Sequence, residues 1–329
     1  MSNVRIGILG AAAIAPAALV KPARGVDRAS VVAVAARDRG RADAFAAKWS
    51  IPAVFDDYEA LVGDPDIDAI YNPLPNSLHA DWTIRALRAG KHVLCEKPLT
   101  SNADQAREVA SVAASSGQVL MEAFHYRYHP MMHRAVEVVR SGELGELRHV
   151  ESWMQVPLFK RRDIRFDLAL GGGAVMDLGC YSIHQLRSIT GEEPSVVSAV
   201  AKERSGDPGV DRWTRAQLRF PSGSTGTFTV SLYGAQALRI GFRATGSKGE
   251  LRVFNPAGPH LAHRFTVRLA DGTTRRETFP KVPTYRYQLE AFCDSVLDGA
   301  PVLTGPTDSV ANMEVIDAVY AAAGLPLRP

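Results

Sequence analysis

The sequence contains little cysteine and no long apolar run. Its three cysteines, Cys95, Cys180 and Cys293, are widely spaced and form no CxxC pair, which argues against a disulfide framework and a zinc ribbon. No stretch of about 18 consecutive apolar residues is present, so we expect no membrane span. The first residues enter an apolar strand directly, so we expect no secretory signal. Together these absences predict a reducing, cytoplasmic location.

The sequence also has little net charge. The excess of +3 over 329 residues is too small to predict a nucleic-acid or membrane partner. The densest basic stretch contains Lys160, Arg161, Arg162 and Arg165. A solvated loop is the favoured interpretation of this stretch, with contact to a phosphate or a subunit as the alternative. The length suits two domains rather than one core.

Several catalytic signatures are missing. The sequence has no G-x-S-x-G and no G-x-x-x-x-G-K-[ST], so hydrolase and kinase activities lack their main parts. Glu122, His125, His129 and His133 have a spacing that could suggest a metal site. However, Pro130 interrupts the helix that would align the three histidines, and none is paired with cysteine, so we expect no metal.

The first half of the chain alternates apolar strands with helices. Runs such as VVAVAA are apolar on both faces, which is typical of a parallel sheet covered by helices. Strands are expected at Val4–Leu9, Val31–Ala36, Ala69–Tyr71, His92–Cys95 and Val119–Met121. Helices are expected from about Ile14, over Arg39–Trp49, over about Leu78–Ala89, and through Ala106–Ala113 to a stop at Gly117.

The second half changes character after about residue 124. Strand-like segments separated by tight turns predict a mostly antiparallel open sheet. These segments are Ser195–Val200, Arg215–Phe220, Gly226–Leu232, Arg239–Ala244, Gly249–Phe254 and Arg264–Leu269, with helices near Met131–Ser141, Val175–Ser188, Tyr287–Leu297 and Ser309–Ala323. We therefore predict a dinucleotide-binding α/β domain over 1–123 and an α+β domain over 124–329. The helix at about 309–323 is a candidate to pack back on the first domain.

The first chemical motif is the turn after the first strand. A dinucleotide-binding turn has the pattern G-x-G-x-x-G, and here its three places are Gly10, Ala12 and Ala15. A helix start at Ala13 and Ile14 offers free N–H groups and a positive dipole end to phosphate. Because two of the three glycines are alanines, a plain tight turn stays an open alternative.

The second motif lies at the end of the second strand. An NAD site usually places a carboxylate there to hold the ribose hydroxyls, but this sequence has Ala36 followed by Arg37. A guanidinium without a neighbouring carboxylate at that place suits a 2′-phosphate, and Arg41 lies one turn further on. The pattern favours NADP over NAD, against the alternative of surface arginines at a helix start.

The third motif is Glu96-Lys97-Pro98, at the end of the strand His92–Cys95. Ligands of open α/β sheets bind at the carboxyl ends of the strands, so topology places Glu96 and Lys97 at the site. The following proline keeps Lys97 out of the helical region. A surface Glu-Lys pair is the alternative.

The fourth motif is a three-glycine loop, Gly171–Gly173, followed by a helix with polar residues. Asp177, Tyr181 and His184 are spaced i, i+4 and i+7, which predicts one shared helix face. The glycines would allow another group to approach closely. The alternative is a solvated polar face.

At these motifs the sequence resembles the Gfo/Idh/MocA family, the relatives of glucose–fructose oxidoreductase and inositol dehydrogenase. The resemblance covers essentially the whole chain and is most specific at Ala89–Pro98, Met121–Phe124 and Gly171–Tyr181. Within the family it is nearest to the branch that holds glucose–fructose oxidoreductase, dimeric dihydrodiol dehydrogenase and NADP-linked xylose dehydrogenases. That branch has tyrosine where many relatives have histidine, here Tyr181.

The resemblance implies the fold, the reaction and most of the site. It implies a Rossmann domain, a second domain whose open sheet often forms the interface of a homodimer or homotetramer, and hydride transfer to or from a sugar-like substrate. It implies a Lys97–Pro98 peptide that is commonly cis, and substrate contacts from Lys97, Arg165, Asp177 and Tyr181. The residues that it implies around the cofactor are Gly10, Ala12, Ala13, Ile14, Arg37, Arg41, Leu74, Asn76, His79, Glu96 and Lys97.

A mechanism follows from these groups. A tyrosine with a pKa near 10 is a poor base at neutral pH, but a nearby ammonium lowers that pKa. We therefore expect Tyr181 as the acid/base, Lys97 as the group that tunes it, and Asp177 to fix the substrate or Lys97, with the two elements meeting across the nicotinamide. His184 is the rival acid/base. A non-catalytic NADP-binding sensor and a glycosidase that oxidises its substrate transiently are the alternatives.

Overall fold

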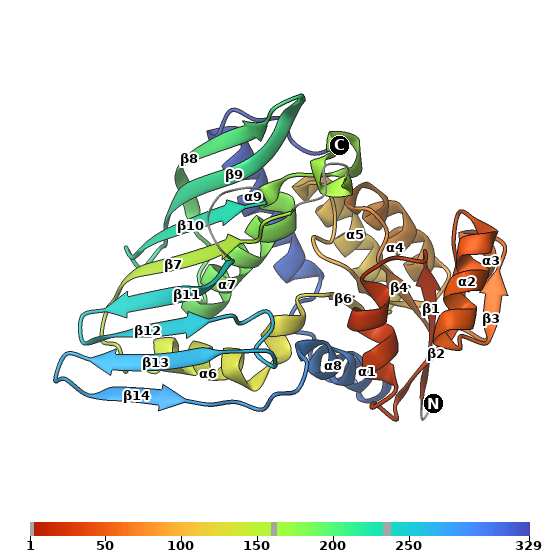
Figure 1. Cartoon of the computed structure of the whole chain (residues 1–329), viewed down its shortest axis with the longest axis horizontal. Coiled ribbons are helices and arrows are strands. Elements are labelled where there is room, and N and C mark those ends of the chain that lie inside the picture. The colour runs from red at the N-terminus through yellow and green to blue at the C-terminus, as the bar shows by residue number, and fades with distance from the viewer. Residues whose placement is uncertain (1–2, 159–162, 233–237) are drawn as a thin grey trace. The chain divides into compact units, whose positions relative to one another are not determined.

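Apolar strands that alternate with helices form a six-stranded parallel sheet in the order β3-β2-β1-β4-β5-β6. The structure is a computed structural model that describes residues 3–158, 163–232 and 238–329. The elements of this first unit are β1 (Val4–Leu9), a π-helical turn (Pro16–Val20), α1 (Lys21–Ala23), β2 (Ala29–Ala35), α2 (Arg39–Trp49), β3 (Ala53–Phe55), α3 (Tyr58–Gly63), β4 (Ala69–Asn72), α4 (His79–Arg88), β5 (His92–Cys95), α5 (Ala103–Ser116) and β6 (Leu120–Glu122) (Figure 1). The predicted Rossmann domain with a parallel sheet is confirmed.

Both faces of the parallel sheet are covered, as its apolar strands require. One core cluster contains Ile6 and Ile8 of β1 together with Leu289 and Phe292 of α8 (Thr284–Asp298). The other face packs on α3, α4 and α5, where Trp82 is among the buried residues. The residues at the centre of both clusters have no exposed surface, and burial of apolar surface is the main stabilisation of such a layered fold.

The chain passes between its two compact units more than once. The first unit contains the residues up to Thr100, Asp104–Tyr128 and Pro283–Val310; the second contains Ser101–Ala103, His129–Val282 and Ala311–Pro329. A single boundary at residue 123 does not describe this arrangement, because α8 packs on β1 and α1 of the first unit. Only the first residues of α9 (Pro306–Ala322) belong to the first unit.

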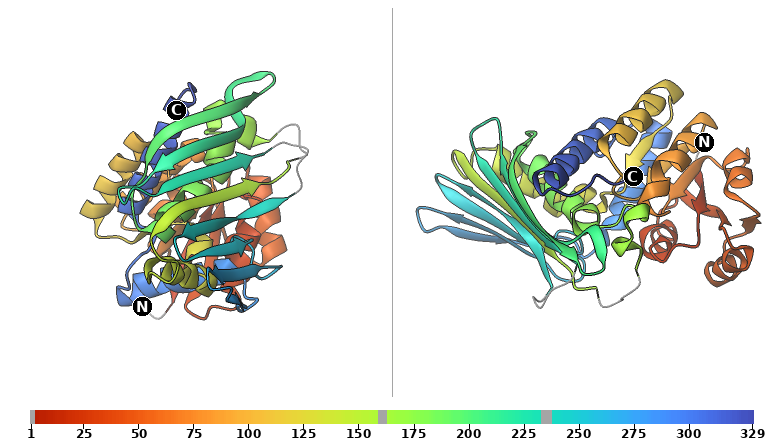
Figure 2. Two further views of the ribbon diagram at one scale, coloured as in Figure 1. Left: turned by 90° about the vertical axis from the view of Figure 1, so that its left-hand side faces the viewer. Right: turned by 90° about the horizontal axis from the view of Figure 1, so that it is seen from above.

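The second unit is built on an eight-stranded sheet in the order β14-β13-β12-β11-β7-β10-β9-β8, antiparallel except where β10 runs parallel to β7. Helices α6 and α7 pack on one face of this sheet, and Figure 2 shows the opposite face without a helix. The elements are α6 (Pro130–Arg140), β7 (Leu147–Gln155), α7 (Cys180–Thr190), β8 (Ser195–Arg204), β9 (Asp207–Arg219), β10 (Thr225–Ser231), β11 (Arg239–Gly246), β12 (Gly249–Phe254), β13 (Arg264–Leu269) and β14 (Thr274–Glu277).

The cysteines and the helices bear on two of the expected absences. Cys95, Cys180 and Cys293 are all free and buried. Among the helices in the described residues, none is both long enough and apolar enough for a membrane crossing. The cytoplasmic location stays a prediction.

Candidate active site

The turn after β1 has the geometry expected of a phosphate-binding turn. Gly10 has φ +86°, and its N–H donates to the carbonyl of Ala35 at 2.6 Å. A Cβ at Gly10 would lie 3.2 Å from Leu74, so both the conformation and the space favour glycine. Ala15 is fully buried in the core, which shows that a methyl group is accommodated where the pattern expects its third glycine. Ala13 and Ile14 are exposed at the start of the helix.

The end of β2 offers guanidinium groups rather than a carboxylate. Asp38, the acidic residue nearest to Arg37, caps α2 by accepting from the N–H of Arg41 at 2.8 Å. Arg39 is held by Asp43 and Asp56. In contrast, the exposed side chains of Arg37 and Arg41 have no carboxylate partner within the part of the chain that the structure describes. These two guanidiniums fit a phosphate group.

His79 ties the loop after β4 to the Lys97-Pro98 segment. Its ring nitrogens lie 2.8 Å from the carbonyl oxygen of Pro98 and 2.7 Å from that of Leu74. The ring is 1% exposed, and burial lowers the pKa of His79 to about 4 against the opposing pull of the two carbonyls. The peptide between Lys97 and Pro98 is cis, as the resemblance implied. Asn76 begins a short 3-10 helix in the same loop.

Buried carboxylates brace the end of β5. Glu96 accepts from the hydroxyl of Tyr71 at 2.8 Å, and burial, with Glu96, raises the pKa of Tyr71 well above its ordinary value. Glu122, on the neighbouring strand β6, accepts from the N–H of Leu99 at 2.9 Å. The segment that contains the half-buried Lys97 is thus fixed on both sides. The surface Glu-Lys alternative is wrong, because Glu96 is only 8% exposed.

The second unit brings Arg165 and Asp177 together. The guanidinium Nε of Arg165 donates to Asp177 at 2.8 Å, and another of its nitrogens donates to Asp163 at 3.1 Å. The negative charge of Asp177, and to a smaller extent that of Asp163, raises the pKa of Arg165 above its ordinary value, so the guanidinium stays charged. Asp177 lies in a π-helical turn, Val175–Gly179, that leads into α7. Such turns occur frequently at functional sites.

The polar residues of this helix are not solvated. Tyr181 is 7% exposed, and His184 is 1% exposed. The side chain of Asp177 is 18% exposed. The alternative of a solvated polar face is therefore wrong. Both Tyr181 and His184 are therefore buried, with Tyr181 slightly more exposed.

Two of the histidines that could suggest a metal site form hydrogen bonds with other parts of the chain. His125 bonds the hydroxyl of Thr284 at 2.7 Å, whereas His129 caps α6 by accepting from the N–H of Met131 at 3.1 Å. Within the described residues, no group of three His, Cys, Asp or Glu side chains has the geometry of a metal site. Lys160, Arg161 and Arg162 lie outside the described residues, so neither interpretation of that basic stretch is tested.

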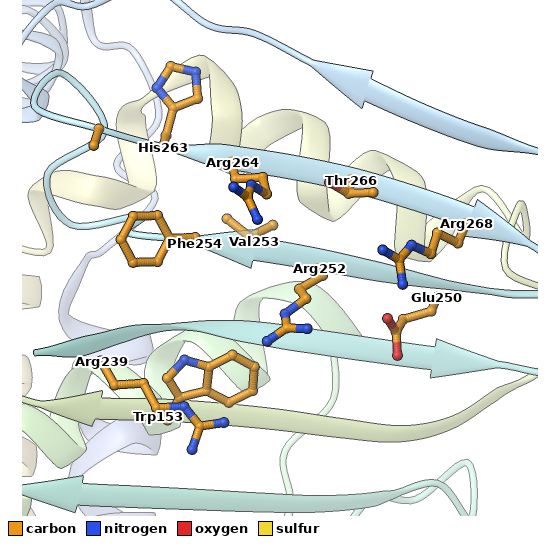
Figure 3. A pocket seen from close by; sticks show the side chains of 11 residues that line it. Trp153, Arg239, Glu250, Arg252, Val253, Phe254, His263, Arg264, Thr266 and Arg268 are labelled. Carbon is orange, nitrogen blue, oxygen red and sulfur yellow. The ribbon is translucent and has the colours of Figure 1, made fainter. Parts of the chain in front are cut away.

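A cavity of about 490 Å³ lies on the helix-free face of the eight-stranded sheet. Figure 3 shows Trp153 of β7 with Arg239, Arg252, Arg264 and Arg268 of the neighbouring strands. The guanidiniums of Arg239 and Arg252 lie 4.4 and 5.9 Å from the centre of the Trp153 indole. None of these arginines has a carboxylate partner in the residues described. No residue of the predicted site lines this cavity, so it is a separate surface feature.

Comparison with known proteins covers nearly the full chain. Residues 4–124 match the oxidoreductase family with an NAD-binding Rossmann fold, and residues 132–252 match the GFO/IDH/MocA C-terminal domain. An NADP-dependent D-xylose 1-dehydrogenase from Haloferax volcanii is 38% identical, with 96% of each chain covered.

Solved structures agree with this similarity. An aldose-aldose oxidoreductase from Caulobacter crescentus, complexed with glycerol, is 28% identical with a TM-score of 0.89, and 98% of each chain is covered. The 3-ketoreductase KijD10 from Actinomadura kijaniata, in complex with NADP and TDP-benzene, is 31% identical with a TM-score of 0.87, covering 97% of this chain and 98% of the other.

Proposed function

Because the chain belongs to the GFO/IDH/MocA oxidoreductase family, we propose that it transfers a hydride between NADP(H) and a carbinol or carbonyl carbon of a sugar-like substrate. It is a dehydrogenase or reductase that acts on CH–OH groups and uses NADP(H). The observation that carries the substrate side of the proposal is the Arg165–Asp177 pair. It holds a partly exposed carboxylate one helical turn before the buried phenol of Tyr181.

The residues of the first unit fit the cofactor. The positive φ of Gly10 and the helix start beside it suit a pyrophosphate, and the unpaired guanidiniums of Arg37 and Arg41 suit the 2′-phosphate of NADP. When bound, the nicotinamide supplies the acceptor or donor of the hydride. We also assign Ala12, Leu74 and Asn76 as contacts of the cofactor.

The protein's own groups handle the proton. Tyr181 takes the hydroxyl proton when the alcohol is oxidised and returns it when the carbonyl is reduced. The Lys97 ammonium favours the phenolate and donates a hydrogen bond to the substrate oxygen. Asp177 accepts a hydrogen bond from a substrate hydroxyl, while the guanidinium of Arg165 donates to the same carboxylate and holds it in place. Proton transfer of this kind contributes about 10²–10⁴-fold, and positioning supplies the larger share.

Turnover with a substrate panel tests the proposal. The protein is incubated with NADP+ and each of a series of aldoses and polyols, or with NADPH and keto-sugars, and the cofactor absorbance is followed. Steady net conversion with at least one class is the expected result. Binding of cofactor without conversion of any member would favour a sensor, and sugar release without net cofactor conversion would favour a glycosidase.

Cofactor preference depends on Arg37. We expect Arg37→Ala to weaken NADPH binding by about 10-fold or more, since a charge-assisted hydrogen bond contributes about 1.5–3 kcal/mol. The Kd of NADH should change little, because NADH has no 2′-phosphate. Fluorescence titration of both cofactors measures the effect. Arg39→Ala is the matched control, because Asp43 and Asp56 already occupy that guanidinium. Equal NADPH and NADH affinities in the unmodified protein would contradict the assignment.

We also propose that the helix-free face of the sheet forms the contact between two or four copies of the chain. Large apolar side chains are exposed there: Val200 of β8 is 62% exposed and Phe254 of β12 is 43% exposed. An exposed apolar patch of this kind marks an interaction surface.

Salt dependence gives this interface a distinctive test. The four unpaired arginines of the cavity bring like charges together when two copies meet, and salt screens that repulsion. Raising sodium chloride from about 10 mM to about 150 mM shortens the screening length from about 30 to about 8 Å, so the dimer Kd should fall. Sedimentation equilibrium measures it. Phe254→Glu should yield monomer, whereas the control Leu303→Glu, an exposed apolar residue of the first unit, should not.

A further inference from the structure

A buried ion pair lies directly under the glycine loop of the second unit. Arg328 and Asp211 both have side chains that are 0% exposed, and a guanidinium nitrogen of Arg328 donates to Asp211 at 3.0 Å. The Nε of Arg328 donates to the carbonyl of Gly172 at 2.6 Å. The guanidinium also stacks on Tyr320 of α9, 3.8 Å from the ring centre. One side chain thus links the last residues, α9, β9 and the glycine loop.

Asp211 connects this ion pair to the start of the helical segment that contains Asp177. One carboxylate oxygen accepts from the N–H of Val175 at 2.9 Å and from the hydroxyl of Thr214 at 2.8 Å. The other accepts from the hydroxyl of Tyr320 at 3.0 Å. The carboxylate is therefore fully used, and it satisfies an N–H at the first turn of the helical segment that contains Asp177.

The network explains why position 173 of this loop is a glycine. Gly173 has φ +137°, and a Cβ there would lie 2.3 Å from Asp211 and 2.7 Å from both Arg328 and Tyr320. A Cβ at Gly172 would lie 2.7 Å from two backbone carbonyl oxygens. At Gly173, the group whose approach the missing side chain permits is thus this buried pair, whereas Gly172 makes room for the backbone of Arg165 and Asp167.

The loop in turn fixes the residues of the proposed site. The N–H of Gly173 donates to the carbonyl of Arg165 at 2.9 Å, and the carbonyl of Gly173 accepts from the N–H of Asp177 at 3.0 Å. The side chain of Arg165 then donates to Asp177 at 2.8 Å. Both partners of the Arg165–Asp177 pair are therefore attached by their backbones to the same glycine.

We propose that Arg328 is a positioning residue for the active site. By holding Gly172 and Asp211, it fixes the loop that sets Arg165 against Asp177 and the start of the helix that continues to Tyr181. This inference rests on the proposed function. Lysine cannot replace Arg328, because a single ammonium on a flexible stem does not reproduce the planar fork that donates to Gly172 and to Asp211 in fixed directions.

The test compares Arg328→Ala and Arg328→Lys with the unmodified enzyme, well below its unfolding temperature. Misplacement of a reacting group by about 1 Å can cost about 10²-fold; we therefore expect kcat to fall at least about 10-fold in both variants. The Kd for NADPH should stay within about two-fold, because the cofactor contacts belong to the first unit. Added guanidinium ion at a non-denaturing concentration should restore part of kcat in Arg328→Ala and none in Arg328→Lys.

Amide hydrogen exchange supplies a readout that needs no substrate. Gly172, Gly173 and Asp177 should exchange faster in Arg328→Ala and slow again with guanidinium. Arg134→Ala is the control: it removes an ion pair with Glu277 of β14 and should leave both the loop and kcat unchanged. A folded Arg328→Ala enzyme with normal kcat, or a loss that guanidinium does not rescue and that leaves exchange unchanged, overturns the proposal.

Two further outcomes keep the inference separate from the proposed function. If the unmodified protein converts no substrate, the proposed function fails, and the exchange data still decide whether Arg328 orders the loop. If Arg328→Ala does not fold, Tyr320→Phe, which removes one hydrogen bond to Asp211, replaces it. Its exchange should then rise at Gly173 and Asp177; unchanged exchange contradicts the proposal.

Discussion

Replacing Tyr181 with phenylalanine should lower kcat by about 10²-fold or more, because it removes the group that transfers the proton. The buried aromatic ring is retained, so the packing around it should be preserved. The Kd for NADPH should change little. Steady-state kinetics with the best substrate of the panel, together with cofactor titration, measure the two effects. Tyr287→Phe on α8 is a matched control and should have normal kcat.

Lys97 and His184 sharpen this prediction. Lys97→Ala should also lower kcat, and its effect combined with Tyr181→Phe should fall far short of the product of the two, because residues that act as one unit are not additive. His184 is buried in the second unit at 1% exposure. A Tyr181→Phe enzyme with near-normal kcat beside an inactive His184→Ala enzyme would transfer the acid/base role to the histidine.

The periodic parts of the fold were predictable because local pattern and burial agree there. The strand and helix at Val4–Leu9 and Arg39–Trp49 have the predicted bounds. In contrast, β7 was missed: its inward-facing residues include the polar Ser152, which donates to Gln185 of α7 at 2.9 Å, while Trp153 lines the cavity on the opposite face. β14, with the sequence TRRE, has no apolar residue at all. A pattern of apolar residues cannot reveal strands of either kind.

Side chains that act near their own motif were predictable, and long-range partners were not. The sequence pointed to Arg37, Lys97 and Asp177 because each stands in or beside a recognisable turn, strand end or helix, whereas Arg165 was implied only by the family resemblance. It suggested that the three glycines admit another group but not which one. Arg328 is separated from Gly172 by more than half of the second unit's chain, and nothing in the residues around it indicates burial. A charged side chain is expected at the surface unless a partner is known.

The stability of the second unit should depend strongly on Arg328. Arg328→Met keeps much of the side-chain volume but leaves the buried Asp211 carboxylate without its counter-charge, and removing one partner of a buried ion pair costs about 3–5 kcal/mol. The control Arg134→Met breaks a pair with Glu277 in which both side chains are partly exposed, and such pairs contribute about 0–1 kcal/mol. Urea unfolding followed by circular dichroism should show this difference in the midpoint.

The second half of this prediction concerns the pair as a unit. Asp211→Asn alone should also destabilise, because it leaves the Arg328 guanidinium buried without a carboxylate. Combined with Arg328→Met, however, the carboxamide oxygen can still accept from Val175 and Thr214, its NH2 group can donate to the hydroxyl oxygen of Tyr320, and no charge stays buried. The double variant should therefore lose much less than the sum of the single losses. Strictly additive losses, or an Arg328→Met variant no less stable than Arg134→Met, would show that the ion pair does not hold the glycine loop in place.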